Sequence, residues 1–118
     1  KKIPFINENE TMKRALNIIT KKNLGTLIVQ NNKKQTTGII TDGQIRRKTR
    51  EIPNIYTKKV KDIMTKNPIS VDKDTLVEKA LSIMYSKKIT SLMVSGNSNK
   101  NKTIGIIHIH NILENSSN

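Results

Sequence analysis

The residues with the clearest capacity for chemistry lie in one stretch, Gly38 to Arg47, which reads GIITDGQIRR. An apolar run ends at Thr41 and Asp42, and a basic segment containing Arg46 and Arg47 follows. A helix N-terminus with an arginine nearby can hold an anion. Adjacent helical residues point about 100° apart, so at most one arginine should face that N-terminus. The alternative is a solvated basic face, or a contact with another domain.

A second stretch holds the two histidines of the chain, His108 and His110, within the sequence GIIHIHNIL (residues 105–113). Two histidines at i and i+2 of a strand share one face and can seat a metal ion. The chain has no cysteine, however, and Glu114 is the closest acidic residue in sequence. Two ligands make a weak metal site, so we predict no metal here. We expect these histidines to line a cleft instead.

The elements that must position these residues form a repeat. In the first half, helical spacing is shown by Met12, Ala15, Leu16 and Ile19. Thr11 or Asn9 could cap this helix. Two apolar strands, 26–29 and 38–41, should follow it, and then a helix over 43–48 capped by Asp42.

The second half repeats this pattern at an offset of 65 residues. The matching helical positions are Val77, Ala80, Leu81 and Met84. Thr75 and Glu78 have the spacing of a capping box at the start of this helix. The strands should cover 92–94 and 105–107, the latter at an offset of 67 because the intervening loop is longer. Residues 112–113 should continue as a short terminal helix.

We therefore predict an α/β fold with a first repeat over 1–49, a linker over 50–59 and a second repeat over 60–118. Each half is too small to bury its apolar faces alone. The halves should pack face to face around a pseudo-two-fold axis and leave two related clefts. A cleft of this kind is a natural small-molecule site. The abrupt start without Met leads us to expect a fragment of a longer protein.

Composition narrows the classes of partner. The net charge is +13 and the pI about 10.2, which would suit a nucleic acid. The lysines are nevertheless scattered, and only 3% of residues are aromatic, so the stacking platforms of a single-strand binder are missing. No run is long enough to span a membrane. We predict a cytoplasmic protein with no nucleic-acid partner, no membrane partner and no cofactor.

The doubled unit with its G-I-I-T corner resembles a pair of CBS domains, the module named after cystathionine β-synthase. The segment VKDIMTKNP (60–68) is similar to the usual start of such a repeat. More narrowly, GIITDGQIRR resembles the G-x-x-T-D-G-D-L-R-R signature of arabinose-5-phosphate isomerases of the 3-deoxy-manno-octulosonate (Kdo) pathway. GIIHIHNIL resembles their G-x-x-H-x-H-D-L-L.

In that family the CBS pair follows a sugar-isomerase (SIS) domain that holds the active site. The resemblance therefore implies a regulatory module without catalytic residues. The parent reaction would interconvert ribulose 5-phosphate and arabinose 5-phosphate. Pathway logic makes an end product, such as the CMP-activated sugar, a reasonable effector.

The resemblance also suggests which residues bind a ligand. In many CBS pairs the corner threonine and an acidic residue three positions later contact the phosphate and ribose of an adenine nucleotide. Here Thr41 is kept and Gln44 replaces the acid; in the second repeat, His108 replaces the threonine and Asn111 the acid. An amide offers one acceptor oxygen where a carboxylate offers two. The candidate ligand-binding residues are Thr41, Asp42, Gln44, Arg46, His108, His110 and Asn111; the structural alternative is that the corners only cap helices.

Two functions of different classes follow. The chain could be a sensor that binds a nucleotide or sugar nucleotide between its repeats and biases an attached isomerase domain. Alternatively, the changes at Gln44 and Asn111 permit a module that has lost its ligand. Such a module would hold a homo-oligomer together through its CBS pairs.

Overall fold

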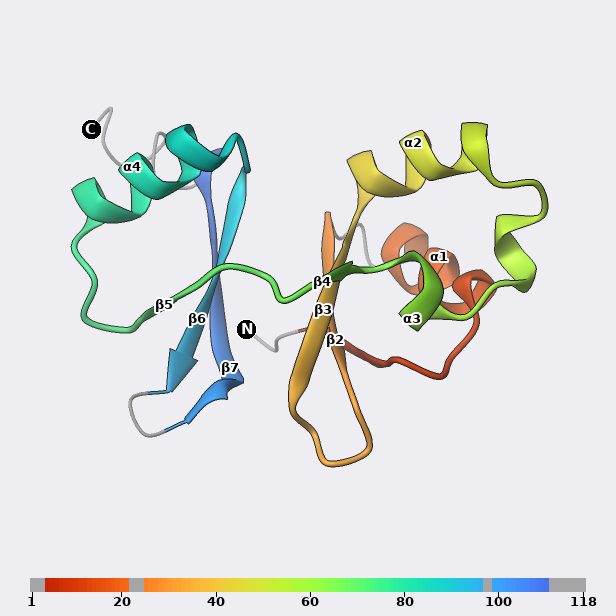
Figure 1. Cartoon of the computed structure of the whole chain (residues 1–118), viewed down its shortest axis with the longest axis horizontal. Coiled ribbons are helices and arrows are strands. Elements are labelled where there is room, and N and C mark those ends of the chain that lie inside the picture. Colours follow the sequence, from red (N-terminus) through yellow and green to blue (C-terminus); the bar gives the residue numbers. More distant parts are fainter. Residues whose placement is uncertain (1–3, 22–24, 97–98, 111–118) are drawn as a thin grey trace. The chain divides into compact units, whose positions relative to one another are not determined.

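The computed structural model describes residues 4–21, 25–96 and 99–110. The chain divides into two compact units, Lys1–Asn67 and Pro68–Asn118. Each unit contains a sheet and at least one helix (Figure 1), so the predicted α/β class is confirmed. None of the helices in the described ranges is long and apolar enough to cross a membrane. The predicted repeat boundaries and the pseudo-two-fold axis stay predictions.

The first unit is built on a four-stranded sheet with the spatial order β1-β2-β3-β4. β1 is parallel to β2, and the other neighbours are antiparallel. The strands are β1 (Phe5–Asn7), β2 (Thr26–Gln30), β3 (Thr36–Thr41) and β4 (Thr65–Lys66). The helical elements are α1 (Met12–Lys21), α2 (Asp42–Glu51), the 3-10 turn η1 (Ile55–Thr57) and α3 (Val60–Ile63). Figure 1 shows these helices gathered on one side of this sheet.

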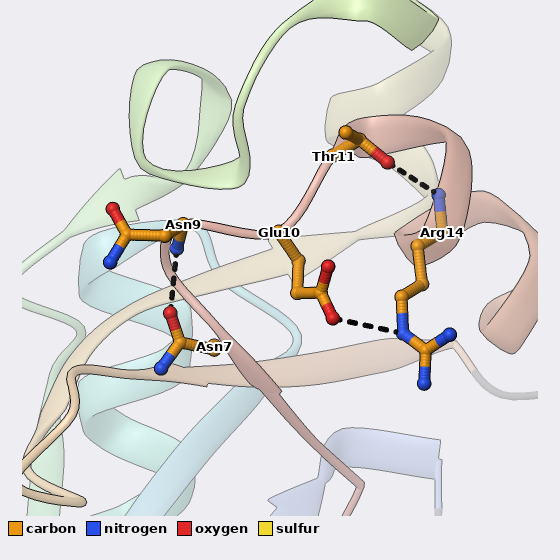
Figure 2. Close-up of polar contacts among 5 residues, drawn as sticks. All are labelled: Asn7, Asn9, Glu10, Thr11 and Arg14. Atoms are coloured by element: carbon orange, nitrogen blue, oxygen red, sulfur yellow. Dashed lines mark hydrogen bonds and ion pairs between the residues drawn. The ribbon is translucent and has the colours of Figure 1, made fainter.

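The start of α1 is fixed by Thr11, one of the two predicted caps. Its Oγ1 accepts the N–H of Arg14 at 3.2 Å, which satisfies a donor that has no partner within the helix. Asn9 does not cap this helix but lies in the preceding turn, where its backbone N–H donates to Oδ1 of Asn7 at 2.8 Å. Figure 2 shows both bonds beside the exposed ion pair between Arg14 Nε and Glu10 Oε2, at 3.1 Å.

The stretch predicted as a linker, residues 50–59, belongs to the first unit and packs against α1. Ile55 and Val60 are buried in the same apolar cluster as Met12 of α1. The backbone reinforces this contact: the N–H of Met12 donates to the carbonyl of Lys58, and the N–H of Val60 donates to that of Glu10, both at 2.8 Å. Residues 55–63 therefore cover the face of α1 on which Met12 lies.

Gly38 allows β4 to approach β3. A Cβ at Gly38 would meet the side chain of Met64 and would lie 2.9 Å from the carbonyl oxygen of Thr65. The equivalent glycine of the second repeat, Gly105, has room, since its Cβ would lie 3.6 Å from Cβ of Val94. The two glycines thus occupy the same repeat position under different packing.

The second unit is smaller. Its sheet has the order β5-β6-β7, with β5 parallel to β6 and β6 antiparallel to β7. The elements are β5 (Ser70–Asp72), α4 (Val77–Lys87), β6 (Ser91–Gly96) and β7 (Asn99–His108). Leu92 pairs with Ile107 just as Leu27 pairs with Ile40, which confirms the predicted correspondence of the two hairpins. The buried core here is Val71, Ala80, Met84 and Leu92.

Three short strands were not predicted. β1, β4 and β5 have two or three residues each, too few for an alternating pattern to stand out. They exist because neighbouring strands supply hydrogen-bonding partners. The predicted order of helix, strand, strand and helix therefore lacked a strand before each of the two long amphipathic helices.

Two predicted caps were wrong. Thr41, not Asp42, is the N-cap of α2, because β3 runs up to Thr41 and Asp42 is already helical. In the second repeat, α4 starts after Leu76 with no side-chain cap. The hydroxyl of Thr75 instead donates to Oδ1 of Asp72 at 3.2 Å, so the predicted capping box with Glu78 does not form. The predicted helix at 112–113 lies outside the described residues.

Candidate functional site

The first candidate site is the corner where β3 passes into α2. Thr41 has extended backbone angles, with φ −121° and ψ 156°, and its hydroxyl oxygen accepts the N–H of Gln44 at 3.2 Å. The N–H of Asp42 donates to the carbonyl of Gly25 at 3.1 Å, which ties the corner to the start of β2. The Asp42 side chain is exposed. The Thr41 hydroxyl can still donate its proton, because the bond to Gln44 uses only an acceptor lone pair.

Gln44 is held inside the first unit. The residue is only 6% exposed, and its Nε2 donates to the carbonyl of Ile63 in α3 at 2.7 Å. This bond fixes the orientation of the amide, because the flipped form would set an oxygen against the carbonyl oxygen. Within the described residues Oε1 is buried without a hydrogen-bond partner. Gln44 therefore presents at most one acceptor atom, and one of the two N–H groups on its Nε2 is bonded to α3.

One arginine folds back over the first turn of α2. Nη1 of Arg47 lies 3.4 Å from the position that a Cβ on Gly43 would occupy. Arg46, the arginine among the candidate ligand residues, is exposed on the same helix. The guanidinium of Arg47, which is also an exposed residue, thus lies close to the first turn of α2. Helix geometry predicted that at most one of the two arginines would face this N-terminus, and the arginine among our candidate ligand residues is Arg46, not Arg47.

The second corner repeats this backbone arrangement with different side chains. His108 pairs with Ser91 as Thr41 pairs with Thr26, and the N–H of Ile109 donates to the carbonyl of Thr90 at 2.8 Å. His108 is the last residue of β7 and is half-buried. His110 lies beyond the strand in a helical turn and is exposed. The two histidines therefore do not share a strand face, because β7 ends between them.

Burial lowers the pKa of His108 from its usual 6.5, and the nearby charge of His110 lowers it further. His108 is therefore mostly neutral at physiological pH, with one ring nitrogen as donor and one as acceptor. Across 4–21, 25–96 and 99–110, no three His, Cys, Asp or Glu side chains gather into a group that could hold a metal ion. The remaining candidate, Asn111, lies outside the described residues.

The groups at the first corner are suited to binding an anion. The unpaired N–H groups of a helix N-terminus carry partial positive charge, and a guanidinium can donate two parallel hydrogen bonds to a phosphate. Thr41 can add a hydroxyl donor. Sequence reasoning did not predict that Gln44 is buried against α3, because nothing in the sequence shows that Ile63 lies beside it.

Comparison with known proteins identifies the family. A model of the CBS domain matches residues 1–51 and 60–118. The chain is 36% identical over 111 residues to the Rickettsia prowazekii protein RP505 and 32% identical over 111 residues to the arabinose 5-phosphate isomerase KdsD of Yersinia pestis. Each alignment covers 94% of this chain and 33% of the relative, so the chain spans about a third of the length of these curated relatives.

A solved structure shares the fold. The CBS domain pair of protein MJ0100, in complex with 5′-methylthioadenosine and S-adenosyl-L-methionine, is similar with a TM-score of 0.86 and 22% identity. The match covers 99% of this chain and 90% of that one. With both repeats matched by the family, the same hairpin register in each repeat and this shared fold, the chain belongs to the CBS-domain family and forms a CBS pair.

Proposed function

We propose that this CBS pair is the regulatory module of a sugar-phosphate isomerase that interconverts ribulose 5-phosphate and arabinose 5-phosphate, and that it senses a nucleotide or sugar nucleotide. The isomerase context is supported by the 32% identity to KdsD of Yersinia pestis. The sensing role is supported by the corner itself. The observation that carries it is the position of Arg47 Nη1, beside Gly43 at the N-terminus of α2.

The effector is held by its phosphate. The phosphate accepts hydrogen bonds from the guanidinium of Arg47, and the partial charge of the α2 N-terminus stabilises it further. Thr41 donates its hydroxyl proton to the same group. Gln44 cannot receive both hydroxyls of a ribose diol, because its single acceptor oxygen is buried and its Nε2 is bonded to Ile63. Recognition at this corner therefore depends on the anion more than on the ribose.

Thermal unfolding with a panel of compounds tests the proposal. The panel contains AMP, ATP, CMP, CMP-Kdo and arabinose 5-phosphate. A compound present at a hundred times its dissociation constant should stabilise the fold by roughly 2.7 kcal/mol. A shift with one of them identifies the effector class. No shift with any compound, in a sample that unfolds cooperatively, contradicts the sensing role.

A pair of variants locates the site. Arg47→Gln should weaken the binding of the active compound at least tenfold, because it removes a charged donor from the phosphate. Arg50→Gln removes the same charge from an exposed position further along α2 and should leave binding unchanged. Equal effects of the two variants would mean that only the overall charge matters, and would remove the corner from the proposal.

A second function is favoured by the hydrogen bond that holds the Gln44 side chain against Ile63 of α3. If that residue is purely structural, the module binds nothing at this corner and serves to assemble the isomerase. The discriminating result is a mass that increases with protein concentration and does not respond to any compound of the panel.

A further inference from the structure

Helix α2 carries most of the arginines of the chain on its exposed side. Only four of the 22 basic residues are arginines, and three of them, Arg46, Arg47 and Arg50, lie within α2. All three are exposed. Helical geometry spaces them over about 100° of the helix surface, on the side opposite the buried Gln44 and Ile45. We call these three residues the α2 arginine face.

The α2 arginine face has no acidic partner of its own. The fourth arginine, Arg14, is paired through Nε with Glu10 at 3.1 Å. In the part of the chain that the structure describes, the α2 arginine face forms no ion pair, although Asp42 precedes Arg46 by four residues. Lysine suffices for general positive charge, whereas the planar guanidinium suits two parallel hydrogen bonds to a carboxylate or phosphate. In a chain whose other basic residues are nearly all lysines, this concentration of arginine indicates a surface that binds anions.

Two of these arginines are separate from the Thr41 corner. Arg47 lies over Gly43 in the first turn, whereas Arg46 and Arg50 are four residues apart and about 40° apart around α2. The rise between these two residues is about 6 Å. Two carboxylates four residues apart on another helix have the same spacing. Such a helix can therefore meet both guanidinium groups at once.

The charge and composition of this surface narrow the class of partner. The net charge of +13 opposes the approach of a second copy of the chain. The exposed residues of α2 are all polar or charged, so this face lacks the apolar side chains with which a helix enters a lipid layer. The sequence of α2 contains no aromatic residue on which a nucleic-acid base could stack. The surface is therefore best matched by the carboxylates of another protein.

We propose that Arg46 and Arg50 bind an acidic helix of a partner protein, through two carboxylates spaced four residues apart. Each guanidinium donates two hydrogen bonds to one carboxylate. Because the contact buries little apolar area, its strength depends on the ionic strength. The proposal leaves Arg47 at the Thr41 corner, and it does not depend on an effector at that corner.

Two helical peptides provide the probe. One is an alanine-rich helix that carries pairs of glutamates four residues apart, and the other has glutamine at the same positions. Fluorescence anisotropy at ionic strengths of about 50 and about 150 mM measures their binding to this chain. The glutamate peptide should bind roughly tenfold more tightly than the glutamine peptide, and should lose affinity at the higher ionic strength. Equal binding of the two peptides overturns the proposal.

A pair of double variants locates the contact. Arg46→Gln combined with Arg50→Gln should weaken binding of the glutamate peptide by roughly tenfold or more. Lys33→Gln combined with Lys34→Gln makes the same charge change in the exposed loop at the opposite end of β3 from α2 (Figure 1), and should leave the affinity within about twofold. All four side chains are exposed, so both variants should keep the circular dichroism spectrum of the original chain. Equal weakening by the two variants would mean that net charge alone attracts the peptide, which contradicts the proposal.

Two further comparisons test the geometry of recognition. Arg46→Lys combined with Arg50→Lys keeps the charge but removes the paired donors, and should weaken binding by roughly threefold or more. A peptide in which the glutamates of each pair are two residues apart has the same charge, but its paired carboxylates lie on different sides of the helix, and it should also bind more weakly. If lysine serves as well as arginine, or if the spacing has no effect, the proposed recognition is wrong.

A DNA duplex separates the proposed partner from a nucleic acid. A short duplex should displace the glutamate peptide no better from the original chain than from the variant with Gln at positions 46 and 50. A duplex that binds more tightly than the peptide, and that depends on Arg46 and Arg50 in the same way, would make nucleic acid the partner and overturn the proposal.

Discussion

The bond between Gln44 and Ile63 gives a sharp prediction about stability. In the variant Gln44→Glu, an ionised carboxylate cannot donate to the carbonyl of Ile63, and it would be placed 2.7 Å from that oxygen in a site that is only 6% exposed. A buried acceptor left without its donor costs about 1–3 kcal/mol. Burial of the charge adds to this cost. We expect a loss of roughly 2–4 kcal/mol of unfolding free energy at pH 7.5.

The loss should depend on pH in a defined direction. Burial and the facing carbonyl both favour the protonated carboxyl, so the folded state raises its pKa above the unfolded value of about 4.3. The protonated form can donate its O–H to Ile63. The variant should therefore approach the original stability below the unfolded pKa, and should lose stability as the pH rises through the higher pKa of the folded state.

Urea unfolding at several pH values between 4 and 7.5, followed by circular dichroism, measures this effect. The matched control is Gln44→Met, which has similar size and removes the donor together with the unpartnered Oε1. Its cost should be smaller than that of glutamate at pH 7.5, and its difference from the original chain should not change with pH. A glutamate variant within about 0.5 kcal/mol of the original chain at pH 7.5, with no pH dependence, would refute the structural role of this bond.

Three other predictions concern the corners and the glycines of the two repeats. Gly38→Ala should lower the free energy of unfolding by about 1–3 kcal/mol, because its methyl group meets β4, whereas Gly105→Ala should be neutral or slightly stabilising. The denaturant midpoints of the two variants test this contrast. Thr41→Val should lower the free energy of unfolding by about 1 kcal/mol, because the α2 cap is lost, whereas Thr41→Ser should keep most of the original stability. Thermal unfolding of both variants tests this. Because the pKa of His108 is lowered in the folded state, the free energy of unfolding should fall as the pH drops below about 6.5. The variant His110→Asn should make that fall shallower. Denaturant titrations between pH 5 and 7.5 measure it, and an unchanged dependence of the unfolding free energy on pH would mean that the two histidines do not interact.

The sequence alone determined the repeat and the main elements. The apolar spacing of Met12, Ala15 and Ile19 indicated α1, and the offset of 65 residues located α4. Such patterns are local, because the side of a helix that meets the core is written in residues three and four positions apart. The G-I-I-T corner and its weaker copy were also visible in the sequence, and they indicated the CBS-domain family.

The tertiary structure decided which groups act together. Thr41 rather than Asp42 caps α2 because Asp42 is already helical, and its N–H is bonded to the carbonyl of Gly25, a residue 17 positions earlier in the chain. Gln44 and Ile63 are 19 residues apart in the chain, and only the packing of α3 against the first unit brings them into contact. The exposure of Val77 on α4 follows in the same way, since residues 55–63 cover the equivalent residue Met12 of α1 and have no equivalent in the described part of the second unit. The spacing of residues along the chain shows which face of an element is apolar, whereas the segment that covers that face is decided by how distant parts of the chain pack together.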